Sequence, residues 1–156
     1  FEDRTNELDT RPMEPPEIQD IYENRTGLKG RYRVLERIHG TGSGFVKGSM
    51  VYREQEDVAG LDRVRYQFSP YLMEALMHLF AFYPAIRQEE DAWNIIPAGM
   101  KEMRFTRPAL NGEHCTLEAR LRSHNDQGFT WDARVVDDSG LTILQVLSLR
   151  MNRFGR

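Results

Sequence analysis

The feature that most constrains this fold is a long apolar stretch interrupted by one acid and one histidine. Residues 69–83 read Ser-Pro-Tyr-Leu-Met-Glu-Ala-Leu-Met-His-Leu-Phe-Ala-Phe-Tyr, and the serine cap and the proline in the first turn predict a helix that ends at Pro84. A helix that is apolar on every face is a buried helix. Glu74 and His78, four residues apart, lie on the same face of it. Because an unpaired buried carboxylate is costly, we expect Glu74 to have a partner or a function.

The remainder of the chain predicts mostly strands. Alternating apolar and charged residues indicate a hairpin, with strands over residues 31–39 and 45–53 joined by a glycine-rich turn. A short helix is expected over residues 17–24, after Pro16. Turn sequences separate five further predicted strands, over residues 93–98, 100–106, 116–122, 129–136 and 141–151. A curved antiparallel sheet wrapped around the one long buried helix is the natural way to cover that helix, which gives an α+β fold class.

Composition limits the classes of partner. The 156 residues are 40% hydrophobic and 29% charged, with a formal net charge of -3, and the cations form no block that would bind nucleic acid or anionic lipid. Residues 1–14 are polar and contain prolines, so we expect a linker or extended arm there and a single domain over residues 15–156. No signal peptide is evident and the apolar stretch is too short to span a bilayer, so no membrane association and a reducing, cytoplasmic setting are expected. Since the first residue is Phe1 and not Met, we expect a piece of a longer protein.

The other three histidines and the single cysteine are weaker candidates for a functional site. We expect surface roles for His39, His114 and His124. His114 and Cys115 lack further partners at metal-ligand spacing, so no metal site is predicted. For Glu74 and His78 the residues leave two interpretations open. The pair is either a satisfied buried structural pair, or a site in which apolar surroundings favour the protonated form of Glu74 and His78 orients it for proton transfer.

Residues 69–78 resemble a known catalytic motif, the His-Pro-Ala-Leu-Leu-Asp-x-x-x-Gln/His sequence of the dehydratase domains of modular polyketide synthases. Pro70, Leu72 and His78 fall on matching positions. Glu74 stands where that family has its catalytic aspartate, and it keeps the carboxylic acid with one more methylene of reach.

A second segment is also similar to this family. Residues 21–33 include Ile-Tyr-Glu and Gly-Leu-Lys-Gly-Arg-Tyr-Arg, similar to the Tyr-Glu to Gly-Leu-x-Tyr-Gly-Pro-x-Phe-Arg segment that opens the second half of such a domain. Two departures accompany the aspartate-to-glutamate change: Ser69 replaces the motif histidine, and residues 29–31 replace Tyr-Gly-Pro. The second departure affects the stretch that borders the substrate entrance in the family.

The resemblance implies a double hot-dog fold, in which two halves each wrap a curved antiparallel sheet around a long central helix. This chain would be the C-terminal half. In the family, a histidine from a His-x-x-x-Gly-x-x-x-x-Pro motif of the first half removes the α-proton of a 3-hydroxyacyl thioester, and the acid of the second half protonates the departing hydroxyl. Glu74 would be that acid and His78 would hold it, while the histidine motif does not occur in these residues.

Further expectations follow from the same resemblance. Pro70, Tyr71 and Gly30 are expected to bind substrate, and no metal or redox cofactor is expected. The implied partners are an acyl carrier protein, whose phosphopantetheine arm carries the substrate, and the N-terminal half of the dehydratase or a second copy of this chain. The parent would be a polyketide or fatty acid synthase. Two alternatives are kept: a non-catalytic hot-dog module for acyl binding or dimerisation, and a thioesterase of the same fold.

Overall fold

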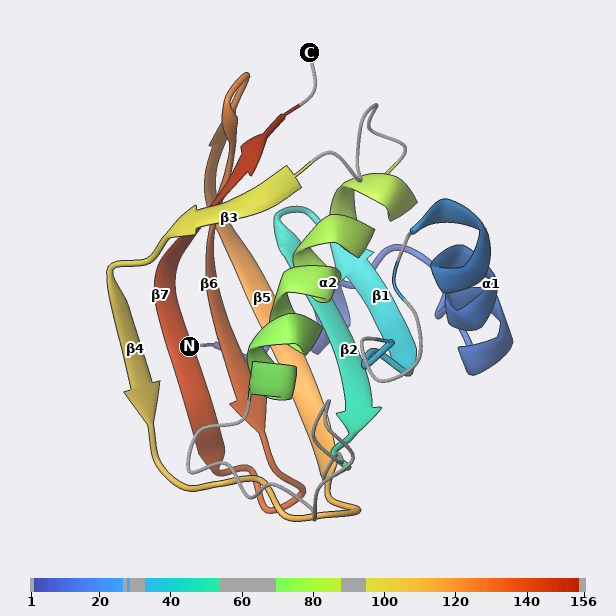
Figure 1. Cartoon of the computed structure of the whole chain (residues 1–156), viewed down its shortest axis with the longest axis vertical. Helices are drawn as coiled ribbons and strands as arrows, with labels where there is room; N and C mark the ends of the chain where they lie inside the picture. The colour runs from blue at the N-terminus through green and yellow to red at the C-terminus, as the bar shows by residue number, and fades with distance from the viewer. Residues whose placement is uncertain (1, 27, 29–32, 54–69, 88–94, 155–156) are drawn as a thin grey trace, which may run out of the picture.

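The computed structural model describes residues 2–26, 28, 33–53, 70–87 and 95–154, and consists of a curved antiparallel sheet with α-helices packed against it (Figure 1). The elements in chain order are a 3₁₀ turn (Thr5–Glu7), α1 (Pro15–Arg25), β1 (Arg37–Gly42), β2 (Phe45–Val51), α2 (Pro70–Ile86), β3 (Ile95–Gly99), β4 (Glu102–Phe105), β5 (His114–Asn125), β6 (Gly128–Val136) and β7 (Thr142–Arg153). The strand order is β1-β2-β5-β6-β7-β3, and β4 also pairs with β7. The predicted α+β class is confirmed.

The predicted apolar helix is α2, and Figure 1 shows it lying across one face of the sheet. Phe80 stacks on Trp131 of β6 with ring centroids 5.2 Å apart, and Tyr83 meets the same indole edge-on at 5.1 Å. On another side of the helix, Glu74 and His78 are only partly buried. The sheet is open and does not close around α2, so the helix is covered by the sheet on one face and only partly buried on the side of Glu74 and His78.

The end of α2 also differs from the prediction. The helix continues two residues beyond Pro84, to Ile86. A proline removes a single N–H donor, and Arg87 N–H still donates to the Tyr83 carbonyl at 3.0 Å, so the last turn closes around it. The predicted cap, Ser69, lies outside the described residues. Neither α2 nor any other helix of the described segments is long and apolar enough to cross a membrane.

The predicted hairpin is formed by β1 and β2, with different boundaries. β1 begins at Arg37, so residues 33–36 of the predicted strand are not part of it, while residues 31–32 lie outside the described residues; the strand continues through the glycine-rich segment to a tight turn at residues 43–44. A Cβ atom on Gly42 would come within 2.5 Å of the Glu7 carbonyl oxygen. Glycine at this position therefore allows the N-terminal arm to approach the strand closely.

That arm runs along β1 on the side away from β2. Asp9 N–H donates to the Thr41 carbonyl at 2.8 Å, and Met13 and Ile38 exchange backbone hydrogen bonds of 2.8 and 3.1 Å. The edge of the sheet at β1 is thus covered by the chain itself. The opposite edge, at β3 and β4, is where a partner could add to the sheet. A domain boundary at residue 14 stays a prediction.

The strands predicted after the helix are β3 to β7, and their predicted turns are confirmed. One feature had no sequence signal: β7 changes partner along its length, pairing with β4 through residues 144–147 and with β3 through residues 150–153. Between them Ser148 adopts a φ of 52° and donates its N–H to the buried Asp132 carboxylate at 2.9 Å. This irregularity lets β7 carry two short edge strands, of which β3 lines the same cavity as α2.

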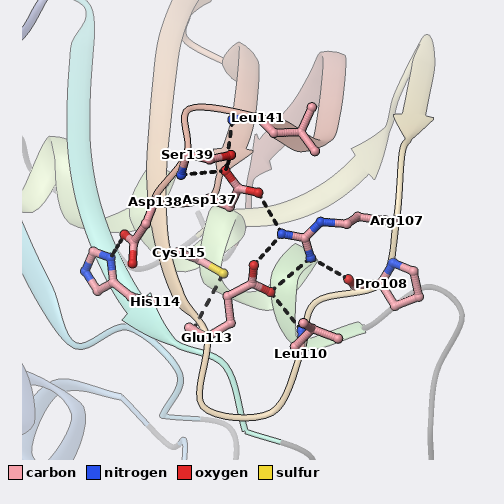
Figure 2. Close-up of polar contacts among 10 residues, drawn as sticks. All are labelled: Arg107, Pro108, Leu110, Glu113, His114, Cys115, Asp137, Asp138, Ser139 and Leu141. Carbon is pink, nitrogen blue, oxygen red and sulfur yellow. Dashed lines mark hydrogen bonds and ion pairs between the residues drawn. The ribbon is translucent and has the colours of Figure 1, made fainter.

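An ion-pair clasp of Arg107, Glu113 and Asp137 joins the loop before β5 to the turn between β6 and β7 (Figure 2). The guanidinium donates to the Glu113 carboxylate at 3.1 Å and to Asp137 at 2.7 Å. Asp137 also accepts hydrogen bonds from the Ser139 hydroxyl and from the Ser139 and Leu141 N–H groups. The Ser139 hydroxyl and then Arg107 lower the pKa of Asp137 to about 2.

The clasp predicts a specific acid sensitivity. Because the pKa of Asp137 is lower in the folded chain than its ordinary value of 3.8, its contribution to stability is present above about pH 4 and is lost as the pH falls toward about 2. In thermal unfolding measured against pH, we expect wild type to lose more stability over this interval than Asp137→Asn. Asp138→Asn, a change at an exposed neighbour, serves as the control. Parallel profiles for wild type and Asp137→Asn would contradict the assignment.

Candidate active site

Glu74 and His78 lie together on the partly exposed side of α2. The His78 Nε2 atom is 3.1 Å from Glu74 Oε2, and the side chains of His78 and Glu74 are 11% and 32% exposed, respectively. Their spacing of four residues places them one helical turn apart, as the sequence predicts. The carboxylate is therefore paired, and it faces open space instead of the sheet.

A third side chain, Tyr22 of α1, completes the group from a distant part of the chain. Its hydroxyl is 2.8 Å from His78 Nδ1, and Leu35 N–H donates to the same hydroxyl at 3.1 Å. The Tyr22 ring contacts the imidazole edge-on, with centroids 5.5 Å apart. Burial raises the pKa of Tyr22 well above its ordinary value, so the phenol remains protonated. The sequence predicts Tyr22 within a helix and within a family-like segment but indicates no role for it.

A cavity of about 470 Å³ opens beside these three residues. Its walls come from α1, α2, β3, β7 and the segment after α1. It is lined by Tyr22, Arg25, Thr26, Leu28, Glu74, Met77, His78, Ala81, Phe82, Ile95, Pro97 and Met151. A mostly apolar wall with a few convergent polar groups, at this volume, is typical of a small-molecule site.

Two of the residues expected to bind substrate do not line this cavity. Pro70 is exposed at the start of α2. Tyr71 is buried and lines a separate cavity of about 310 Å³, together with residues of α1 and β2. Successive residues of a helix point about 100° apart, so neighbours of a catalytic residue in sequence need not face the same space. Gly30 lies outside the described residues.

The other histidines lie away from the cavity. His39 contacts the Ser49 hydroxyl at 3.2 Å, His114 pairs with Asp138 at 2.9 Å, and His124 stacks on a phenylalanine. Cys115 is buried, which raises its pKa to about 12 and makes it a poor nucleophile. Within the described segments, no group of three or more His, Cys, Asp or Glu side chains could hold a metal ion.

Solved structures share this fold. The dehydratase domain from the CurF module of the curacin polyketide synthase matches with a TM-score of 0.69 and 18% identity, over 96% of this chain and 50% of its own. GphF dehydratase 1 matches with a TM-score of 0.67 and 22% identity, over 95% of this chain and 52% of its own. Zebra fish thioesterase superfamily member 2 matches with a TM-score of 0.62 and 14% identity, over 92% of this chain and 99% of its own. The hot-dog fold is confirmed, and the chain spans about half the length of these dehydratases.

The family follows from the sequence itself. No curated protein sequence matches the chain, but residues 3–156 match the family model described as the polyketide synthase dehydratase N-terminal domain. That description names an N-terminal domain, whereas the motif residues of α2 resemble the second half of a dehydratase domain, so the assignment to the second half stays a prediction. Because the match extends over nearly all of its residues, the chain belongs to the polyketide synthase dehydratase family.

Proposed function

We propose that this chain is the acid-bearing half of a dehydratase that removes water from a 3-hydroxyacyl thioester to give a 2-enoyl thioester. The observation that carries this proposal is the position of Glu74, a paired carboxyl group at the wall of a mostly apolar cavity. Elimination needs an acid at the departing hydroxyl and a base at the α-carbon. Glu74 is the acid, and closure of the cavity over it by a second unit is what would keep its proton for the substrate instead of for bulk water.

The base must come from outside this chain's cavity wall. His78 is the one imidazole among the described lining residues, and both of its ring nitrogens have partners, Tyr22 at Nδ1 and Glu74 at Nε2. An imidazole held on both sides is poorly placed to take a proton from an α-carbon. We therefore assign the base to a second hot-dog unit.

The edge strand β3 is where this unit would dock. Ile95 and Pro97 of β3 line the cavity, while Ile96, on the other face of the strand, is 49% exposed. Among the described strands β3 pairs with β7 alone. The related dehydratase structures are about twice as long as this chain, which leaves length for a second unit. A unit paired along β3 closes the cavity and brings its histidine near Glu74.

This arrangement predicts that the chain on its own self-associates through β3. We expect Ile96→Lys to weaken the association by roughly tenfold or more, since a charged side chain on an edge strand opposes strand pairing. Leu110→Lys is the matched control, because Leu110 is also exposed, at 65%, but lies in the loop before β5. Analytical ultracentrifugation measures both. A wild-type monomer at high concentration, or equal effects of the two variants, would contradict the docking site.

The substrate is proposed to arrive on the phosphopantetheine arm of an acyl carrier protein. Arg25, in the last turn of α1, is exposed and also lines the cavity. A guanidinium at such a position suits the phosphate of the arm, since arginine binds phosphate oxygens through paired hydrogen bonds.

The test is turnover of a 3-hydroxyacyl thioester, followed by the ultraviolet absorbance of the conjugated 2-enoyl product. The parent protein should form the product, and the isolated chain should form little or none because it lacks the base. Rapid turnover by the isolated chain would place the base within these residues. A parent protein that forms no enoyl product would contradict the dehydratase assignment.

Hydrolysis of a thioester is the second candidate function. A carboxylate beside an apolar cavity can also act as a general base toward water, and a thioesterase superfamily member shares the fold. The two activities differ in product, because hydrolysis releases a free acid and thiol whereas elimination keeps the thioester.

A further inference from the structure

Tyr22 combines complete burial with ring contacts and hydrogen bonds to named partners. It is 1% exposed, and its ring contacts both His78 and Phe82 edge-on, at 5.5 and 5.9 Å between centroids. The hydroxyl lies between two nitrogens, the Leu35 amide at 3.1 Å and His78 Nδ1 at 2.8 Å. A backbone amide can only donate, so Leu35 occupies an acceptor site of the hydroxyl.

Counting hydrogens then distinguishes the two neutral forms of His78. If the single Tyr22 hydrogen goes to Nδ1, the imidazole hydrogen sits on Nε2 and points to Glu74 Oε2, 3.1 Å away. In the opposite form, Nδ1 donates to Tyr22, and the buried phenol hydrogen has no acceptor among the contacts of the described residues. Nε2 would then also have no hydrogen to donate to Glu74 Oε2. Only the first form, with hydrogen on Nε2, gives the Tyr22 hydroxyl and both His78 nitrogens a hydrogen-bond partner.

We propose that Tyr22 is a positioning residue that fixes His78 in the Nε2–H form and thereby orients Glu74. Leu35 N–H fixes the phenol, the phenol fixes the imidazole, and the imidazole donates to Oε2 of the carboxyl group. Oε1 receives no hydrogen bond from the described residues and is the oxygen left to exchange a proton with a ligand in the cavity. The tautomer assignment stands on the geometry alone, whereas its catalytic consequence rests on the proposed function.

The direct test is nuclear magnetic resonance of the chain labelled with ¹⁵N at its four histidines, with His78 assigned by its absence in His78→Gln. Long-range ¹H–¹⁵N spectra of neutral imidazoles distinguish Nε2–H from Nδ1–H. We expect wild-type His78 to be Nε2–H, and Tyr22→Phe to turn it into a mixture of the two forms. A wild-type His78 with hydrogen on Nδ1, or one unchanged by Tyr22→Phe, would overturn the proposal.

Tyr83→Phe is the matched control. Tyr83 is also buried, and its hydroxyl also accepts a backbone N–H, from Gly44 at 2.9 Å, but it is not among the partners of His78. This variant should leave the His78 spectrum unchanged. If Tyr22→Phe does not fold, the wild-type spectrum still decides the tautomer.

A kinetic readout separates this proposal from the proposed function. In the parent protein, Tyr22→Phe should lower kcat about tenfold, the effect of one ordinary hydrogen bond lost in the transition state, with little change in KM. Should Tyr22→Phe alter the tautomer while Glu74→Gln leaves dehydration intact, the Tyr22 assignment stands and the proposed function fails. If Tyr22→Phe leaves the tautomer unaltered while Glu74→Gln abolishes dehydration, the proposed function stands and the Tyr22 assignment fails.

Discussion

Replacing Glu74 with glutamine should lower the rate of water elimination by the parent protein roughly 10²–10⁴-fold, the usual contribution of a general acid. Glutamine keeps the shape of the side chain, and its carbonyl oxygen can still accept from His78 Nε2, 3.1 Å from the present carboxylate. It cannot supply a proton to the departing hydroxyl. The loss should therefore appear in kcat, with KM nearly unchanged. Steady-state kinetics on a 3-hydroxyacyl thioester measures both.

Two further variants make this result specific. Glu74→Asp restores the residue type that the dehydratase motif carries at this position, and it should retain part of the activity. Glu14→Gln makes the same chemical change at a side chain that is 52% exposed and pairs with Arg37, and it should have no effect. If Glu74→Gln retains wild-type turnover, Glu74 is a structural partner of His78 and not the acid.

Replacing Trp131 with alanine should destabilise the fold by about 3–5 kcal/mol, the usual cost of deleting a buried large aromatic side chain. Trp131 has no exposed surface and packs against Phe80 and Tyr83 of α2. Phe80 lies parallel to it, with an interplanar angle of 5°, and Tyr83 and Phe129 pack against other parts of the indole. A cavity at this point removes the aromatic contact of α2 with β6, so urea unfolding should show a large fall in the midpoint.

Matched substitutions separate packing from hydrogen bonding. The Trp131 Nε1 atom has no hydrogen-bond partner among the described residues, so Trp131→Phe loses area but no hydrogen bond and should cost less than Trp131→Ala. Phe154→Ala removes an aromatic side chain that is 47% exposed and should change stability by no more than about 0.5 kcal/mol. A Trp131→Ala variant as stable as Phe154→Ala would contradict the packing of α2 on β6.

Much of the fold could be predicted because its signals are local. The apolar helix with Glu74 and His78, the alternating strands and their turns are each encoded within a few neighbouring residues. The boundaries that failed have two different causes. At Gly42, the close approach of the arm residue Glu7 depends on a contact across 35 residues of chain. The end of α2 differs for a local reason, since the Arg87 N–H still bonds to the Tyr83 carbonyl beyond Pro84.

The residues of the candidate site also fall into two groups, those that a local sequence pattern brings together and those that only the fold brings together. Glu74 and His78 could be paired from sequence because four residues make about one helical turn. Tyr22 could not, because it contacts His78 across 56 residues of chain. The β3 and β7 walls of the cavity depend on the strand order, which no local pattern specifies. Tyr71, expected from the family resemblance to bind substrate, lines a different cavity from Glu74, and its role in substrate binding stays a prediction.

Dehydration at Glu74 can be observed on the substrate itself, as the mass of a carrier protein that bears a 3-hydroxyacyl group, measured after a single turnover with the parent protein. We predict that the carrier loses the mass of one water and keeps its acyl thioester, and that this loss is suppressed in Glu74→Gln. Loss of the whole acyl group would identify a thioesterase. An unchanged mass would contradict catalysis at Glu74 altogether.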